Sequence, residues 1–435
     1  MQILLTIAFS LFFIFLIGKL KFFRIGGISV KILQFGFIIK LLAGIAVGLV
    51  YTYYYTDRLT ADTFKFFDDS KILFDAVYAQ PLDYLRMLSG IGSNSAHLQQ
   101  YYDTMTNWYD TFSPFNDNRT MIRLNAFLRI FSMGYYYVHV AVVCFLSYIG
   151  IVLFVKVFSR EFPENVLEIF LVFLLLPSVL FWGSGLLKDA LVFFTFGLMI
   201  SAFNRLIISP RFPLSAFCYF ILTLFLLMIT KFQVFLISLP LITAWFITSR
   251  FKINALFSFS MVSVLFFILV YGMSNAFPGM DLINLLVQKQ QAFFTLAAIA
   301  DAGSIISIPE LKPEFFNLLI NAPIGFFTSL TRPFISDTGA VLNTISAIEN
   351  ILILGLGIYC IVNFKLNNVK GKILPVFCLF YTLYSFTLIG MITPVLGAIV
   401  RYKAQALPFM VVLLIIAAHP AIKKQLIRIL PKSIL

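Results

Sequence analysis

Charged residues are scarce in this sequence, and their scarcity decides the class of protein. Only 12% of the 435 residues are Asp, Glu, Lys or Arg, against roughly 25% in soluble domains. By contrast, 60% are apolar and 52 are Phe. A water-soluble fold cannot bury so much apolar surface. The composition therefore excludes a soluble enzyme, a nucleic-acid-binding protein and a disordered chain, and it indicates that the solvent is a lipid bilayer.

Residues that bind metals or form disulfides are also few. The chain has four cysteines and three histidines, with no CxxC pair and no Cys/His metal spacing. Each cysteine lies in an apolar run, so we expect small buried side chains rather than a disulfide framework. We expect His139 to be a hydrogen-bonded interior residue. The sequence contains no cofactor motif, and it leaves a divalent cation open as a cofactor.

Long apolar stretches recur at about the 20 residues needed to cross a bilayer. In lipid each must form a helix, because no water is present to satisfy open backbone groups. We predict an all-α, polytopic transmembrane helix bundle that forms a single integral membrane domain over 1–435. About eleven spans are expected, with ten or twelve also compatible. They are 2–18, 32–54, 133–155, 165–182, 190–208, 213–230, 233–249, 254–271, 341–362, 373–392 and 405–419.

Lys and Arg are distributed unevenly between the connections. The short loops that carry most of them fall on one side in the eleven-helix arrangement, and the positive-inside rule places that side in the cytoplasm. This predicts a protein of the cytoplasmic (inner) membrane with its N-terminus outside and its C-terminus in the cytoplasm. The residues are Lys19, Lys21, Arg24, Lys31, Lys156, Arg160, Arg205, Arg211, Arg250, Lys252, Lys365, Lys370, Lys372, Lys423, Lys424, Arg428 and Lys432.

Two long segments, 55–132 and 272–340, then face the outside. The first is rich in Asp and contains no Glu, and it alternates aromatic with polar residues. This pattern favours short amphipathic helices that lie on the membrane surface. The second segment has a similar character and is predicted to form similar surface helices.

Charged residues close to a bilayer are costly, so each is a candidate for function. Arg and Lys can bind a phosphate or diphosphate, and a carboxylate can deprotonate an attacking hydroxyl group. The predicted topology brings both kinds to the outer face. The candidate bases are Asp62, Asp68 and Asp69, and the candidate substrate- and phosphate-binding residues are Lys188, Asp189, Lys231, Arg332, Arg401 and Lys403.

These candidates also have structural explanations. Asp68 and Asp69 could begin a helix, where carboxylates are favourable, and Asp62 could cap one. Lys188 and Asp189 could pair with each other at a helix start. Because nine Asp share the first external segment, the sequence does not choose between a catalytic and a structural role for any one of them.

Lys188 and Asp189 end a short sequence pattern. Its form is P-S-x-x-x-W-x-S-x-x-x-K-D, and its residues are Pro177, Ser178, Trp182, Ser184, Lys188 and Asp189. With the many helices and the Asp-rich external loop, it resembles the GT-C class of integral-membrane glycosyltransferases. The resemblance implies a polyprenyl-phosphate or polyprenyl-diphosphate sugar donor and an Asp of the first external loop as catalytic base. In that class the loop usually follows the first helix, whereas here it follows the second.

The expected function is transfer of a sugar from a polyprenyl-phosphate-type carrier to a glycan or lipid acceptor on the external face, in cell-envelope polysaccharide synthesis. Arg332, Arg401 and Lys188 would bind the carrier phosphate. The external arginines also resemble those of O-antigen polymerases, which keeps an oligosaccharide repeat-unit polymerase open. A transporter or flippase of a lipid-linked or anionic sugar and a non-catalytic envelope assembly protein are further alternatives. No nucleic-acid partner is expected.

Overall fold

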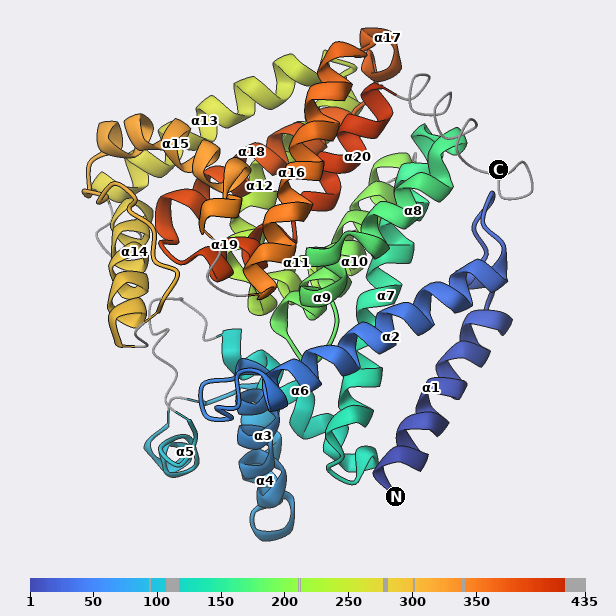
Figure 1. Cartoon of the computed structure of the whole chain (residues 1–435), viewed down its shortest axis with the longest axis vertical. Coiled ribbons are helices and arrows are strands. Elements are labelled where there is room, and N and C mark those ends of the chain that lie inside the picture. Colours follow the sequence, from blue (N-terminus) through green and yellow to red (C-terminus); the bar gives the residue numbers. More distant parts are fainter. Residues whose placement is uncertain are drawn as a thin grey trace. The chain divides into compact units, whose positions relative to one another are not determined.

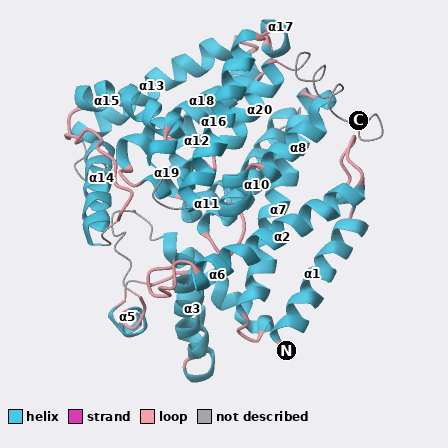
Figure 2. Cartoon of the chain, viewed as in Figure 1, coloured by secondary structure: helices cyan, strands magenta, loops and turns pink. Residues whose placement is uncertain are grey.

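The structure, a computed structural model, describes residues 1–93, 95–106, 117–209, 211, 213–276, 281–299, 302–337 and 341–418. These residues form helices and loops, with two isolated β-bridges and no strand among them (Figure 2). The predicted all-α fold is therefore confirmed. Four residues named above lie outside the described residues: Lys423, Lys424, Arg428 and Lys432.

Helices account for most of the described chain (Figure 1). In chain order they are α1 (Gln2–Lys19), α2 (Val30–Tyr53), α3 (Asp62–Ala79), α4 (Pro81–Ser89), α5 (Ala96–Tyr102), α6 (Asp117–Ser132), α7 (Tyr136–Glu161), α8 (Val166–Leu175), α9 (Pro177–Trp182), α10 (Lys188–Ile208), α11 (Leu214–Thr230), α12 (Phe232–Phe251), α13 (Ala255–Ala276), α14 (Leu282–Ile299), α15 (Phe315–Thr331), α16 (Val341–Val362), α17 (Leu366–Val369), α18 (Leu374–Ile392), α19 (Leu396–Lys403) and α20 (Leu407–Ala417).

Eight of the described helices are long and apolar enough to cross a membrane, namely α1, α2, α7, α10, α12, α13, α16 and α18. The pair α19 and α20, bent by 59°, adds a ninth if it forms one span. The chain is therefore an integral membrane protein. Two predicted spans differ: 213–230 forms the 17-residue α11, and 165–182 divides at Leu176 into α8 and α9. The residue before a proline avoids helical backbone, which explains the break before Pro177.

The chain folds into two compact units, each described by itself. Unit 1 comprises Met1–Val157, Val179–Leu206 and Arg211–Gln233. Unit 2 comprises Phe158–Ser178, Ile207–Pro210 and Val234–Leu435.

In unit 1 the helices approach one another closely through small residues. A Cβ atom on Gly150 of α7 would lie 2.0 Å from the carbonyl oxygen of Phe193 in α10. Only glycine leaves room for that approach, which is the usual way in which helices associate in a bilayer. Aromatic packing joins α1 to α2, where the rings of Phe13 and Phe37 meet edge to face at 6.2 Å.

In unit 2 the corresponding contact joins α15 to α18. A Cβ atom on Gly390 of α18 would lie 1.9 Å from the carbonyl oxygen of Gly325 in α15. Gln290 of α14 donates to the Met391 carbonyl at 2.7 Å and accepts from the backbone N–H of Leu311 at 2.8 Å. Thus α15 packs along a spanning helix, whereas the sequence predicts that it lies on the membrane surface.

Gly390→Leu should therefore destabilise the protein. The added side chain has no space against Gly325, and overpacking costs about 1–3 kcal/mol or more. We expect the melting temperature in detergent to fall by several degrees, whereas Gly355→Leu on α16, where a Cβ atom would meet nothing within 4 Å, should leave it unchanged. Equal melting temperatures for the two variants would contradict this packing.

Candidate functional site

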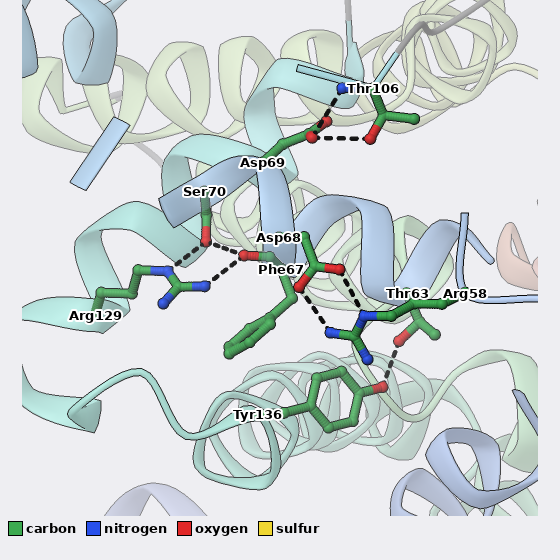
Figure 3. Close-up of polar contacts among 9 residues, drawn as sticks. All are labelled: Arg58, Thr63, Phe67, Asp68, Asp69, Ser70, Thr106, Arg129 and Tyr136. Atoms are coloured by element: carbon green, nitrogen blue, oxygen red, sulfur yellow. Dashed lines mark hydrogen bonds and ion pairs between the residues drawn. The ribbon is translucent and has the colours of Figure 1, made fainter. Parts of the chain in front are cut away.

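The three candidate bases lie on one helix of unit 1, α3. Asp62 is its first residue, after Ala61 as N-cap without a side-chain cap. Asp68 and Asp69 lie well inside the helix, so the expectation that they begin a helix is wrong. Neighbouring residues on a helix point about 100° apart, and the two carboxylates accordingly point to different surroundings (Figure 3).

Asp68 forms a bidentate ion pair with Arg58, which precedes α3. Its two carboxylate oxygens accept from Nη2 and Nε of Arg58 at 2.7 and 2.8 Å, and the guanidinium lies 4.3 Å from the centre of the Phe64 ring. The Asp68 side chain remains 45% exposed. Exposed pairs of this kind contribute about 0.2–1 kcal/mol, so Asp68 is available to a substrate at small cost to stability.

Asp69 has a different environment. It is buried and accepts hydrogen bonds from the backbone N–H and the hydroxyl of Thr106 at 3.0 and 2.9 Å. It therefore fixes the chain that follows α5. On the same helix, burial lowers the pKa of Lys65, while the carboxylates of Asp62 and Asp69 act in the opposite direction.

A buried arginine holds α3 in place. Arg129 of α6 donates from Nε to the Ser70 hydroxyl at 2.8 Å and from Nη2 to the Phe67 carbonyl at 2.6 Å (Figure 3). Its guanidinium lies 4.3 Å from the centre of the Phe67 ring. At the start of the helix, the hydroxyl groups of Thr63 and Tyr136 of α7 share a hydrogen bond of 2.5 Å. Arg129 is not among the candidates from the sequence, because only the fold shows what it contacts.

His139 of α7 is an interior residue, as predicted. Its Nδ1 lies 2.7 Å from Oδ1 of Asn125, and its Nε2 lies 2.6 Å from the Ser132 hydroxyl. All three side chains are fully buried. The ring also packs edge to face against Phe67, with centroids 5.1 Å apart. His139 thus joins α6 and α7 to the helix that carries the candidate bases.

The other charged candidates of unit 1 gather in two ion pairs. Lys188 lies 2.7 Å from Asp117, with side chains 13% and 11% exposed. Lys231 lies 3.4 Å from Asp189, with side chains 12% and 1% exposed. We call these four residues the ion-pair cluster. Lys188 and Asp189 thus have separate ion-pair partners, rather than pairing with each other.

Helix ends bring the ion-pair cluster together. Asp117 begins α6, Lys188 and Asp189 begin α10, and Lys231 lies between α11 and α12. The Thr120 hydroxyl donates to the Ile229 carbonyl at 2.6 Å, which joins α6 to the end of α11. Carboxylates at helix starts are favoured by the helix dipole. The sequence singled out three of the four residues and missed Asp117, which it had grouped with the other Asp of the external loop.

In unit 2, Lys403 ends α19 and contacts the end of α15. Its ammonium donates to the Arg332 carbonyl at 2.7 Å, to Oδ1 of Asn350 at 2.8 Å and to the Ser329 carbonyl at 3.4 Å. An ammonium group has three donors, and each has an acceptor here. Asn350 in turn donates to the Thr331 carbonyl at 2.6 Å. These contacts make Lys403 the cap of a helix C-terminus rather than an open phosphate ligand.

The two candidate arginines of unit 2 are more accessible. Arg332 forms an ion pair with Asp337, and its side chain is 33% exposed. Burial raises the pKa of Asp337, but hydrogen bonds from Arg332 and from the Phe334 N–H outweigh it, so this pKa lies below its ordinary value. Arg401 of α19 is half-buried.

The predicted site residues are thus divided between the units. Asp62, Asp68, Asp69, Lys188, Asp189 and Lys231 lie in unit 1, and Arg332, Arg401 and Lys403 lie in unit 2. That all of them gather at the outer face stays a prediction.

The four cysteines differ in their exposure. Cys144, Cys360 and Cys378 are buried, as predicted, whereas Cys218 is exposed. Within the described residues, no three His, Cys, Asp or Glu side chains are grouped so that they could hold a metal ion.

Comparison of the chain with protein-family models, with curated proteins and with solved structures finds no match.

Replacement of Arg129 should loosen α3. Arg129→Ala removes two charge-assisted hydrogen bonds at a buried position, each contributing about 1.5–3 kcal/mol. We expect a clearly lower melting temperature and faster amide exchange over residues 62–79. Arg58→Ala, which removes a half-exposed pair from the same helix, serves as the control and should change both only slightly. A larger effect of Arg58→Ala would show that the anchor has been misassigned.

Proposed function

We propose that the protein is a membrane glycosyltransferase that moves a sugar from a polyprenyl-phosphate-type carrier to an acceptor on the external face. The observation that carries the proposal is the ion-pair cluster. Four charged side chains from three separate parts of the chain meet, nearly buried, where the spanning helix α10 begins. Charges at such places are costly and are commonly retained for function.

The ion-pair cluster suits a phosphate group. Lys188 and Lys231 each have a carboxylate partner, so the cluster is neutral and tolerable in the absence of a ligand. A lysine ammonium has three donors, and a phosphate can join or replace a carboxylate on them. The backbone N–H groups at the start of α10 add a favourable potential for an anion. A polyprenyl tail would remain among the apolar helices.

The contacts on α3 narrow the choice of catalytic base. Asp69 is buried and accepts two hydrogen bonds from Thr106, which fits a structural role. Asp68 is half-exposed, and Asp62 at the helix start is partly exposed. Helix α2 passes both regions: a Cβ atom on Gly48 would lie 3.0 Å from the ring of Tyr136, whose hydroxyl bonds Thr63 of α3, and a Cβ atom on Gly44 would lie 2.9 Å from the backbone nitrogen of Gly185, just before α10. In this proposal Asp62 or Asp68 is the base on α3 that accepts the proton of the attacking hydroxyl.

Undecaprenyl phosphate is a direct probe of phosphate binding. Lys188→Ala or Lys231→Ala should weaken its binding to the purified protein about 10- to 100-fold, the effect of losing one charge-assisted hydrogen bond. Lys71→Ala, from an exposed pair with Asp75 on α3, should leave the affinity unchanged. Undecaprenol, which lacks the phosphate, should bind all variants alike. The proposal fails if the two buried lysines can be replaced without loss of affinity.

Asparagine variants test the base. Asp62→Asn or Asp68→Asn should reduce glycan transfer by about 10²–10⁴-fold while undecaprenyl phosphate binding persists, because only proton removal is lost. Asp75→Asn on the same helix is the matched control and should transfer at the wild-type rate. Wild-type transfer by both Asp62→Asn and Asp68→Asn would exclude a base on this part of α3.

A transporter is the second candidate, and one feature of the helices favours it. α19 and α20 are bent by 59° at a short break, and α8 and α9 are interrupted at Leu176. Discontinuous helices are typical of transporter binding sites. In sealed vesicles a transporter would move a lipid-linked sugar across the bilayer unchanged, whereas a transferase would alter it. A repeat-unit polymerase would instead yield products of increasing length.

A further inference from the structure

A lysine lies in the apolar interior of unit 1. Lys40 is near the middle of α2, a 24-residue spanning helix, and it is 1% exposed. A lysine at the centre of a spanning helix costs about 2.5–3.5 kcal/mol on insertion scales. Within the described residues no carboxylate forms an ion pair with Lys40. Its role must therefore be read from its other contacts.

Those contacts lie on the loop 183–187, which connects α9 to α10. The Lys40 ammonium donates to the Gly183 carbonyl at 2.6 Å and lies 3.4 Å from the Ser184 hydroxyl. The Ser147 hydroxyl of α7 donates to the same Gly183 carbonyl at 2.8 Å. Irregular backbone at membrane depth is tolerated only when its polar groups are satisfied inside the protein. Lys40 and Ser147 satisfy this carbonyl from two different helices.

The loop is also fixed by close packing. The backbone N–H of Gly185 lies 3.4 Å from the sulfur of Cys144. Gly185 has φ +73°, which favours glycine, and a Cβ atom on Gly44 of α2 would lie 2.9 Å from the Gly185 nitrogen. The loop therefore has little freedom between α2 and α7. Lys188, three residues after Gly185, begins α10 from this fixed point.

We propose that Lys40 is a positioning residue for the ion-pair cluster. By holding the loop 183–187 at Gly183, it sets where α10 begins and brings Lys188 and Asp189 within reach of Asp117 and Lys231. This inference rests on the proposed function only where it concerns phosphate binding. Lys40 acts through the loop and does not itself contact the substrate, because its ammonium is directed at Gly183 and Ser184.

Amide exchange and ligand binding in lipid nanodiscs test the proposal together. Lys40→Met keeps the length and apolar stem of the side chain but removes the donor. The Gly183 carbonyl keeps the Ser147 hydroxyl as a donor, and Met does not carry the cost of a charged group at the centre of a spanning helix, so the melting temperature should stay within a few degrees of wild type. Exchange over residues 183–190 should nevertheless become about tenfold faster, and the Kd for undecaprenyl phosphate should rise about tenfold.

Two further variants complete the experiment. Lys31→Met, an exposed lysine on the same helix, should change neither exchange nor Kd. Ser147→Ala removes the second donor to Gly183 and should accelerate exchange over the same residues to a smaller extent. It tests the loop anchor even if Lys40→Met does not fold.

The outcomes separate the two proposals. Unchanged exchange over 183–190 in Lys40→Met overturns the positioning role, and a raised Kd with unchanged exchange would make Lys40 a direct ligand instead. Faster exchange, in a protein whose wild type does not bind undecaprenyl phosphate, supports the positioning role and counts against the proposed function.

Discussion

Charged and polar groups inside a bilayer must find partners within the protein, because lipid offers none. This requirement accounts for how two helix ends of this chain are held. At the end of α15, Lys403 donates to the Arg332 and Ser329 carbonyls, and after α9, Lys40 donates to the Gly183 carbonyl. In both places a lysine from another helix satisfies backbone that the helix itself leaves open.

The same requirement distinguishes two kinds of buried lysine. Lys40 and Lys403 are directed at carbonyl or amide oxygens, and those contacts maintain the fold. Lys188 and Lys231 form ion pairs with carboxylates, and a carboxylate is a partner that another anion can replace. Function is therefore better assigned to the second kind. On α3 the same reasoning separates Asp69, which holds Thr106, from the more accessible Asp62 and Asp68.

The long apolar stretches were sufficient to predict the all-α fold, and charge near them was sufficient to select Lys188, Asp189 and Lys231. Their partners could not be predicted, because Asp117 lies far from Lys188 in sequence and only the fold brings them together. Pro333 marks the end of α15 in the sequence, but only the fold shows that Lys403 of α19 lies there. Lys40, a lone charge inside the predicted span 32–54, carried the same signal and could have been selected, but its acceptor in the loop 183–187 is visible only in the fold.

The central claim is that the ion-pair cluster binds phosphate and is not only an element of stability. The most direct measurement replaces one pair by an apolar pair, Asp117→Leu with Lys188→Met, so that no unpaired charge remains. Our account predicts a melting temperature equal to or above that of the wild type, together with loss of undecaprenyl phosphate binding. Retention of wild-type affinity by the stable double variant would contradict it.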